Sequence, residues 1–265
     1  MGLMTATGPF SRAPAGTFNS EMTLYLEPTP KRVRVIVGGE TIADSRRVMI
    51  LHETGHQPVY YFPPGDVRSE FLEPSDRHTR CPKKGEASYW SVRVGDRVVE
   101  AGAWYYPDGP IGLSGLIAFY WDRMDHWLEE DEEVFGHPRD PYARIDLLRS
   151  DRAVRVVLEG ELLAESRDAV VLFETGLPPR WYLPLEDVLA ELEPSETVTR
   201  CPYKGLASYY SIKGGERDLA WYYPEPLAEV GRIAGLVCFF NERVDLWLDG
   251  ELQDRPASKT TGSRG

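Results

Sequence analysis

The sequence predicts a mostly β protein made of two tandem domains with little helix. The first observation behind this prediction is an internal repeat: RCPKKGEASYWS at 80–91 returns as RCPYKGLASYYS at 200–211, 120 positions later. The second is that short β-branched and aromatic runs alternate with Gly and Pro, a pattern typical of short antiparallel strands. A length of 265 residues allows one large domain or two small ones, and the repeat decides for two.

The repeat extends far beyond this segment. Its spacing changes only in Gly-rich text where loops are expected, so the blocks between are structural elements. The other matched blocks are 33–35 with 154–156, 51–55 with 172–176, 61–67 with 182–188, 104–107 with 221–224, and 123–128 with 243–248. We therefore expect domains at 22–135 and 136–252, a partly flexible extension at 1–21 and a disordered tail at 253–265.

The local pattern predicts individual elements. Val33, Val35 and Val37 alternate before Gly38-Gly39, which indicates a strand followed by a hairpin turn. Helix is scarce. Further strands are expected at 47–53, 169–174 and 207–212, a closing hairpin from 235–240 and 243–248, and helical turns near Pro63, near Pro184 and at 141–149.

The connector between the domains resembles the start of the first domain. Ile145 and Leu147 align with Leu24 and Leu26, so each domain has a lead-in segment. We therefore expect the connector, 129–151, to pack against a domain.

Composition excludes several classes of function. The net charge is −12 and no basic cluster is present, which disfavours nucleic-acid binding. No run approaches 18 apolar residues, so no membrane span is expected. The N-terminus does not have the pattern of a signal peptide, and three cysteines fit a reducing compartment. We expect a cytoplasmic monomer whose two domains pack in one chain and whose partner is a small molecule of unknown identity.

The strings RCPxKGxASYxS, WYYP and GLxxFxxxRxDxW occur in this order in both copies. The chain resembles the DUF427 family of bacterial proteins, in its tandem-domain form. This resemblance implies a β-tent fold, in which two antiparallel sheets meet at an angle and are pinned along one edge, and it suggests ligand binding between the sheets.

Many β-tent proteins are pinned by zinc on two Cys-x-x-Cys pairs. Each copy here has one matched cysteine, Cys81 or Cys201, and the paired motif is absent. Structural zinc normally takes four ligands, so we expect no metal, and no cofactor is expected either. No histidine is matched between the copies, which removes the usual activator of a catalytic thiol, and both cysteines are interpreted as buried and structural.

The matched polar and aromatic residues are the candidates for a site. A carboxylate, an ammonium group and hydroxyl-bearing rings are suited to a small-ligand pocket. The alternative is that the rings fill a β core while the charges form a structural pair. The candidates are Glu53, Tyr61, Lys84, Ser88, Tyr89, Trp104 and Tyr106 in the first copy, and Glu174, Tyr182, Lys204, Ser208, Tyr209, Trp221 and Tyr223 in the second.

A second matched motif reads Arg123-x-Asp125-x-Trp127. In a strand its three side chains would share one face, which favours an Arg–Asp clasp stacked on the indole. The same reading applies to Arg243, Asp245 and Trp247.

Three functions remain open from the sequence. The leading hypothesis is a small-molecule-binding protein with one aromatic and polar pocket per repeat between the two sheets. The first alternative is an enzyme of hydrolase or transferase type that uses Glu53 and Lys84, or Glu174 and Lys204, as acid and base. The second is a protein-interaction module, which a large exposed apolar patch would favour.

Overall fold

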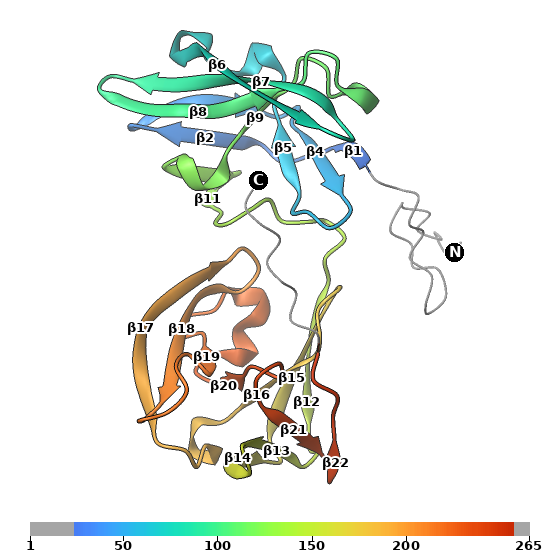
Figure 1. The fold of residues 1–265 in the computed structure, drawn as a ribbon, viewed down its shortest axis with the longest axis vertical. Coiled ribbons are helices and arrows are strands. Elements are labelled where there is room, and N and C mark those ends of the chain that lie inside the picture. The colour runs from blue at the N-terminus through green and yellow to red at the C-terminus, as the bar shows by residue number, and fades with distance from the viewer. Residues whose placement is uncertain (1–23, 257–265) are drawn as a thin grey trace. The chain divides into compact units, whose positions relative to one another are not determined.

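The computed structural model describes residues 24–256, which form two compact units that divide between Asp140 and Pro141 (Figure 1). We call them unit 1 and unit 2 and describe each by itself. The extension expected at 1–21 lies outside the described residues, as does the part of the expected tail after Pro256.

Unit 1 consists of antiparallel strands and short 3-10 turns. Its three sheets have the strand orders β1-β4-β5, β11-β10-β2-β3 and β6-β7-β8-β9. The strands are β1 (Leu24–Pro28), β2 (Val33–Val37), β3 (Glu40–Ser45), β4 (Met49–Glu53), β5 (Val59–Tyr61), β6 (Leu72–Cys81), β7 (Gly85–Val94), β8 (Arg97–Tyr105), β9 (Ile117–Phe119), β10 (His126–Glu129) and β11 (Glu132–Glu133). The turns are η1 (Pro64–Asp66), η2 (Ser69–Phe71), η3 (Pro110–Gly112) and η4 (Trp121–Arg123).

Unit 2 repeats this arrangement with two sheets, in the orders β12-β15-β16-β20-β19-β18-β17 and β14-β13-β21-β22. Its strands are β12 (Ile145–Ser150), β13 (Val154–Leu158), β14 (Glu161–Ser166), β15 (Ala169–Glu174), β16 (Arg180–Leu183), β17 (Leu192–Cys201), β18 (Gly205–Ile212), β19 (Ala220–Tyr222), β20 (Val237–Phe239), β21 (Asp245–Leu248) and β22 (Glu251–Leu252). Its turns are η5 (Leu185–Asp187) and η6 (Ala228–Ile233).

The two topologies are equivalent strand by strand. In unit 1, Phe62 and Ile117 exchange backbone hydrogen bonds of 2.7 and 2.9 Å, which joins β5 to β9 as β16 is joined to β20 in unit 2. Each unit therefore has one long sheet and one four-stranded sheet. This confirms the expected mostly β fold of two tandem domains with antiparallel sheets.

The main core of each unit lies between these two sheets. In β2 the residues alternate in burial, and Val33, Val35 and Val37 are fully buried. They pack with apolar residues from one face of the long sheet, such as Phe62 and Phe119. The period-2 pattern that predicted this strand is thus the pattern of a sheet with one face on the core.

Several predictions about elements are confirmed. Val33–Val37 and Glu40–Ser45 form the expected hairpin, and short turns follow Pro63 and Pro184. Both lead-in segments are strands: β1 pairs with β4, and β12 pairs with β15. The connector therefore packs, as expected.

Three predictions are wrong. The segment 141–149 is not a helix, because Ile145–Ser150 forms β12 and pairs along its length with β15. The strands of the expected closing hairpin belong to different sheets: β20 pairs with β16 and β19, whereas β21 pairs with β13 and β22. The turn between them carries the chain from the long sheet to the four-stranded sheet.

The third error concerns the motif at 123–127. Arg123 lies in η4 and its guanidinium stacks over Tyr120 at 4.4 Å, while Asp125 pairs with Arg97 at 2.8 Å, so no Arg123–Asp125 clasp forms. In the second copy Asp245 pairs with Arg255. The strand begins only at residue 126 or 245, which removes the arginine from the shared face.

The strand register also separates residues that the sequence aligns. Trp127 lies opposite Val35, whereas Leu246 lies opposite Val156, the counterpart of Val35. Leu246 therefore takes the structural position of Trp127, because unit 2 reaches this position one residue sooner after the preceding strand: Trp127 is eight positions after Phe119, and Leu246 is seven after Phe239. Trp127 is 3% exposed, while Trp247 is not among the buried residues.

No helix within residues 24–256 is both long enough and apolar enough to cross a membrane.

The pairing of β12 leads to a prediction about proteolysis. Because Arg149 sits in a ladder with β15, trypsin should not cut after it in the folded protein. Limited trypsinolysis followed by mass spectrometry tests this, with thermally unfolded protein as the cleavable control. Rapid cleavage after Arg149 in the folded chain would contradict the expectation.

Candidate functional site

The matched charged residues form an ion pair in each unit. In unit 2, Lys204 Nζ donates to Glu174 Oε2 at 2.5 Å, with side chains 11% and 9% exposed. In unit 1, Lys84 Nζ donates to Glu53 Oε2, and Lys83 Nζ lies 3.5 Å from Glu53 Oε1. The sequence left two interpretations of these charges open, a ligand pocket and a structural pair, and in both copies the two groups are paired with each other.

The ion pair shows that the long sheet is strongly bent. Glu174 ends β15, and Lys204 lies in the turn between β17 and β18, four to five strands away in the sheet order. In a flat sheet that separation is roughly 19–24 Å, which two side chains cannot span. Figure 1 accordingly shows β17 and β18 facing β12 and β15 across unit 2. We call the Glu–Lys contact the pin of each unit.

A tight turn places the lysine of the pin. The residue after it, Gly85 or Gly205, has φ of +91° or +97°, a conformation that L side chains rarely adopt. The Pro-x-Lys-Gly sequence therefore closes the turn between two long strands with the lysine at its tip. The glycine matched in both copies serves this turn.

A second link crosses the bend between aromatic side chains. Trp104 Nε1 donates to Tyr61 Oη at 3.2 Å, and Trp221 Nε1 donates to Tyr182 Oη at 3.1 Å. The rings meet edge to face in both units, at interplanar angles of 84° and 89°. The same interaction, preserved twice, holds β5 to β8 and β16 to β19.

The other candidate tyrosines are packed in the same clusters. Tyr89 and Tyr106 are 6% exposed and Tyr223 is 4% exposed. Tyr89 Oη is 2.8 Å from Thr79 Oγ1, and Tyr209 Oη is 2.8 Å from Thr199 Oγ1. These clusters lie on the face of the long sheet opposite the main core.

The serines lie elsewhere. Ser88 alternates with Tyr89 along β7 and so faces the other side of the sheet, where its Oγ is 3.2 Å from His78 Nδ1. Ser208 occupies the same position of β18. The structure therefore brings twelve of the fourteen candidates together, six in each unit, and leaves both serines out.

Burial controls the charge states of these groups. Desolvation raises the pKa of the Tyr61, Tyr106, Tyr182 and Tyr223 phenols above their ordinary value, so they stay neutral. For Glu53, burial acts to raise the pKa, but the hydrogen bond and charge of Lys84 outweigh it and the net shift is downward. An acid–base catalyst needs a pKa near the working pH, whereas the pKa of Glu53 is shifted away from it.

The cysteines differ from the expectation. Cys81 and Cys201 are partly exposed rather than buried, because each ends the long strand before the pin turn. Cys238 is the buried thiol, and desolvation raises its pKa. Within residues 24–256, no three His, Cys, Asp or Glu side chains gather as a metal site would require.

Sequence reasoning missed one member of each cluster. Tyr120 packs on Trp104 with a ring-centroid distance of 4.6 Å, and Phe240 packs on Trp221 at 4.5 Å. The two residues are 120 positions apart and both aromatic, so a search for matched residue class rather than identity finds them.

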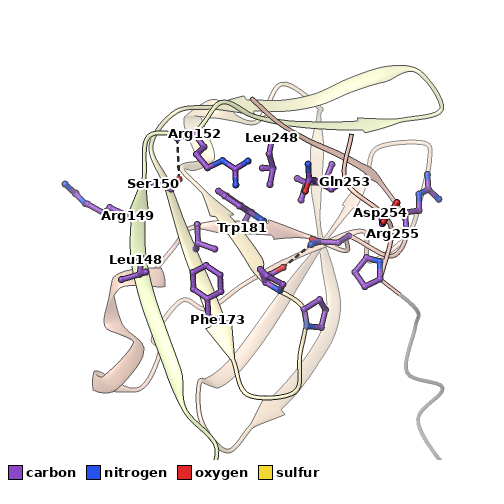
Figure 2. A pocket seen from close by; sticks show the side chains of 16 residues that line it. Leu148, Arg149, Ser150, Arg152, Phe173, Trp181, Leu248, Gln253, Asp254 and Arg255 are labelled. Atoms are coloured by element: carbon purple, nitrogen blue, oxygen red, sulfur yellow. Dashed lines mark hydrogen bonds between the residues drawn. The ribbon is translucent and has the colours of Figure 1, made fainter. Parts of the chain in front are cut away.

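Unit 2 also contains an open cleft that sequence reasoning missed entirely. It has a volume of about 630 Å³ and lies between the edge of the long sheet and the four-stranded sheet (Figure 2). Its walls include Val171, Phe173, Trp181, Leu246 and Leu248. The segment 253–256 closes one side, held by a hydrogen bond from Gln253 N to Leu246 O. None of the fourteen candidates lines it.

Side chains occupy the corresponding place in unit 1. Trp121 stacks on Trp127 with a ring-centroid distance of 4.3 Å and an interplanar angle of 4°. In unit 2 these positions hold Asn241 and Leu246, both of which line the cleft. We call the Trp121–Trp127 stack the indole plug; its replacement by two smaller side chains opens the cleft.

The polar groups at this place differ as well. In unit 1, Glu129 accepts hydrogen bonds from Tyr60 Oη at 2.8 Å and from Lys31 Nζ, and it is 8% exposed. Glu129 lies opposite Val33 and Leu248 lies opposite Val154, so Leu248 replaces this carboxylate in unit 2. Tyr60 and Lys31 correspond to Trp181 and Arg152.

Comparison with known families identifies two segments. A family model described as Domain of unknown function (DUF427) matches residues 25–130 and 146–250. A search of curated proteins found no match to the chain.

The pin leads to a prediction about stability. Glu53→Gln leaves the largely buried Lys84 without its carboxylate and should cost about 3–5 kcal/mol of unfolding free energy. The control is Glu73→Gln, whose partner Arg93 and own side chain are about half exposed, and which should cost under about 1 kcal/mol. Chemical denaturation measures both. Equal costs for the buried and the exposed pair would refute the pin.

Acid should weaken the same contact. A carboxylate whose pKa is lowered by folding stabilises the protein above its unfolded pKa, and this contribution disappears as the pH falls through its folded pKa. The stability difference between wild type and Glu53→Gln should therefore be large at neutral pH and shrink well below pH 4.5. Denaturation at both pH values tests this, and a constant difference would contradict it.

Proposed function

The chain belongs to the DUF427 family, and we propose that it acts as a small-molecule-binding protein whose ligand site is the cleft of unit 2. The observation that supports this proposal is the loss of the indole plug in one copy of a repeated fold. Ligand sites are commonly concave, mostly apolar and between 300 and 1,000 Å³, as a general range. The cleft, at about 630 Å³, is within it.

The two copies differ in what they offer a ligand. The sequence hypothesis assumed one pocket per repeat at matched residues. The twelve clustered residues are packed against one another and paired, so a ligand there would have to displace the pin or the aromatic links. The cleft of unit 2 offers space without breaking any of these contacts.

The apolar surface of unit 2 favours the same site. Leu148 and Phe173 are 55% and 42% exposed, and both line the cleft. Their counterparts in unit 1 are Glu27 and His52, which form a contact of 3.0 Å with each other. Exposed apolar residues beside a cavity are typical of a binding site.

An unidentified ligand requires an unbiased experiment. Thermal-shift and calorimetric titration of a metabolite library against the full chain should give at least one compound that stabilises the wild type. Asn241→Trp combined with Leu246→Trp, which restores the plug of unit 1, should weaken that compound about tenfold or more.

The control for this variant is Val198→Trp, which adds an indole at an exposed position of β17 away from the cleft. It should leave affinity unchanged, and thermal unfolding should show that both variants fold. Undiminished binding by the folded, plugged variant would refute the proposed site.

A further inference from the structure

We propose that the ligand of the unit 2 cleft is a planar aromatic acid, with its ring against Trp181 and its carboxylate on Arg152. This inference rests on the proposed function and adds the chemical class of the ligand. It comes from comparing the charged groups at the same place in the two units.

Arg152 is the cation directed into the cleft. Figure 2 shows its side chain pointing into the cavity above Trp181, while Arg149 points away. Its guanidinium lies 5.6 Å from the centre of a Trp181 ring. Arg152 Nε donates to Asp249 Oδ2 at 2.6 Å, and this is the only side-chain hydrogen bond of Arg152 recorded within residues 24–256. The two terminal nitrogens are thus available to a carboxylate, which guanidinium groups bind in a bidentate manner.

In unit 1 the indole plug occupies the place of the cleft, and the cation beside it has an internal partner. There the corresponding cation, Lys31, bonds the buried carboxylate of Glu129. Unit 2 keeps the cation but has Leu248 in place of the carboxylate. Arg152 pairs instead with Asp249, through Nε alone, so a ligand carboxylate would be a second partner, bound by the two terminal nitrogens.

The side chains that line the cleft indicate the shape of the rest of the ligand. The plug that is missing from unit 2 is a pair of stacked indoles, so the vacated space suits a flat ring system. Trp181 and Phe173 offer aromatic surfaces, and offset or edge-to-face contacts between rings are favourable. Asp254 also lines the cleft, in the 253–256 wall. Arg255 bonds Asp245 through both Nε and a terminal nitrogen, whereas Arg152 bonds Asp249 through Nε alone. Arg152 is therefore the cation for the acid group.

The test compares 1-naphthoate with its neutral analogue 1-naphthamide by isothermal titration calorimetry on the full chain. The acid should bind about 10- to 100-fold more tightly, the usual advantage of charge-assisted hydrogen bonds. Arg152→Met should remove this advantage and leave the affinity for the amide unchanged. Arg155→Met, which removes an exposed arginine of β13, should preserve it.

The outcomes separate this inference from the proposed function. If acid and amide bind equally and the plugged variant loses both, the cleft binds ligands but the assignment of an acid is wrong. An equal loss in the Arg152 and Arg155 variants would also overturn it, since the effect would then be one of net charge. If neither compound binds the wild type, the aromatic acid is ruled out, and the library titration alone decides whether the cleft binds another class.

Discussion

The bend of the long sheet in each unit is spanned by an electrostatic contact between two ends of that sheet. A long antiparallel sheet has no intrinsic reason to bring strands four or five places apart within hydrogen-bond distance. The Glu–Lys pin does so in both units, with its side chains largely buried. Once the ends of the sheet are held together, the concave face becomes an enclosed space, and the tyrosines and tryptophans of the second cluster fill it.

A buried ion pair has an unfavourable desolvation free energy, because both charges lose their hydration. Here the cost is offset by aromatic packing beside the pin and by the Trp–Tyr hydrogen bond, which satisfies two buried polar groups without charge. The pin and the aromatic link thus act together: the pin connects the ends of the bent sheet, and the aromatic side chains pack on its concave face.

The matched residues predicted this part of the molecule well, and for a physical reason. Where both units make the same contact, its residues are identical in the two copies and equally spaced, as with Glu53 and Lys84. Identity between the copies therefore indicates shared architecture. The motif at 123–127 shows the limit of that reasoning. Identical residues there occupy different structural positions, because the chain between β20 and the start of the β21 pairing is one residue shorter than the equivalent segment of unit 1. Strand pairing, which fixes the register, is not visible in a comparison of two short strings.

The cleft could not be predicted from residues that are identical in the two copies, because the residues that open it in unit 2 differ from their counterparts in unit 1. Replacing an indole by a smaller side chain in a core normally costs several kcal/mol, about 3–5 for Trp→Ala. The same fold fills this place in unit 1, so the open state in unit 2 is not imposed by topology. The changes there also agree with one another: the plug is lost, the buried Glu129 becomes Leu248, and the cation stays as Arg152, which bonds Asp249 through Nε alone. A random loss of packing would not retain a charge beside a newly apolar wall, whereas a site for an external aromatic acid requires that combination.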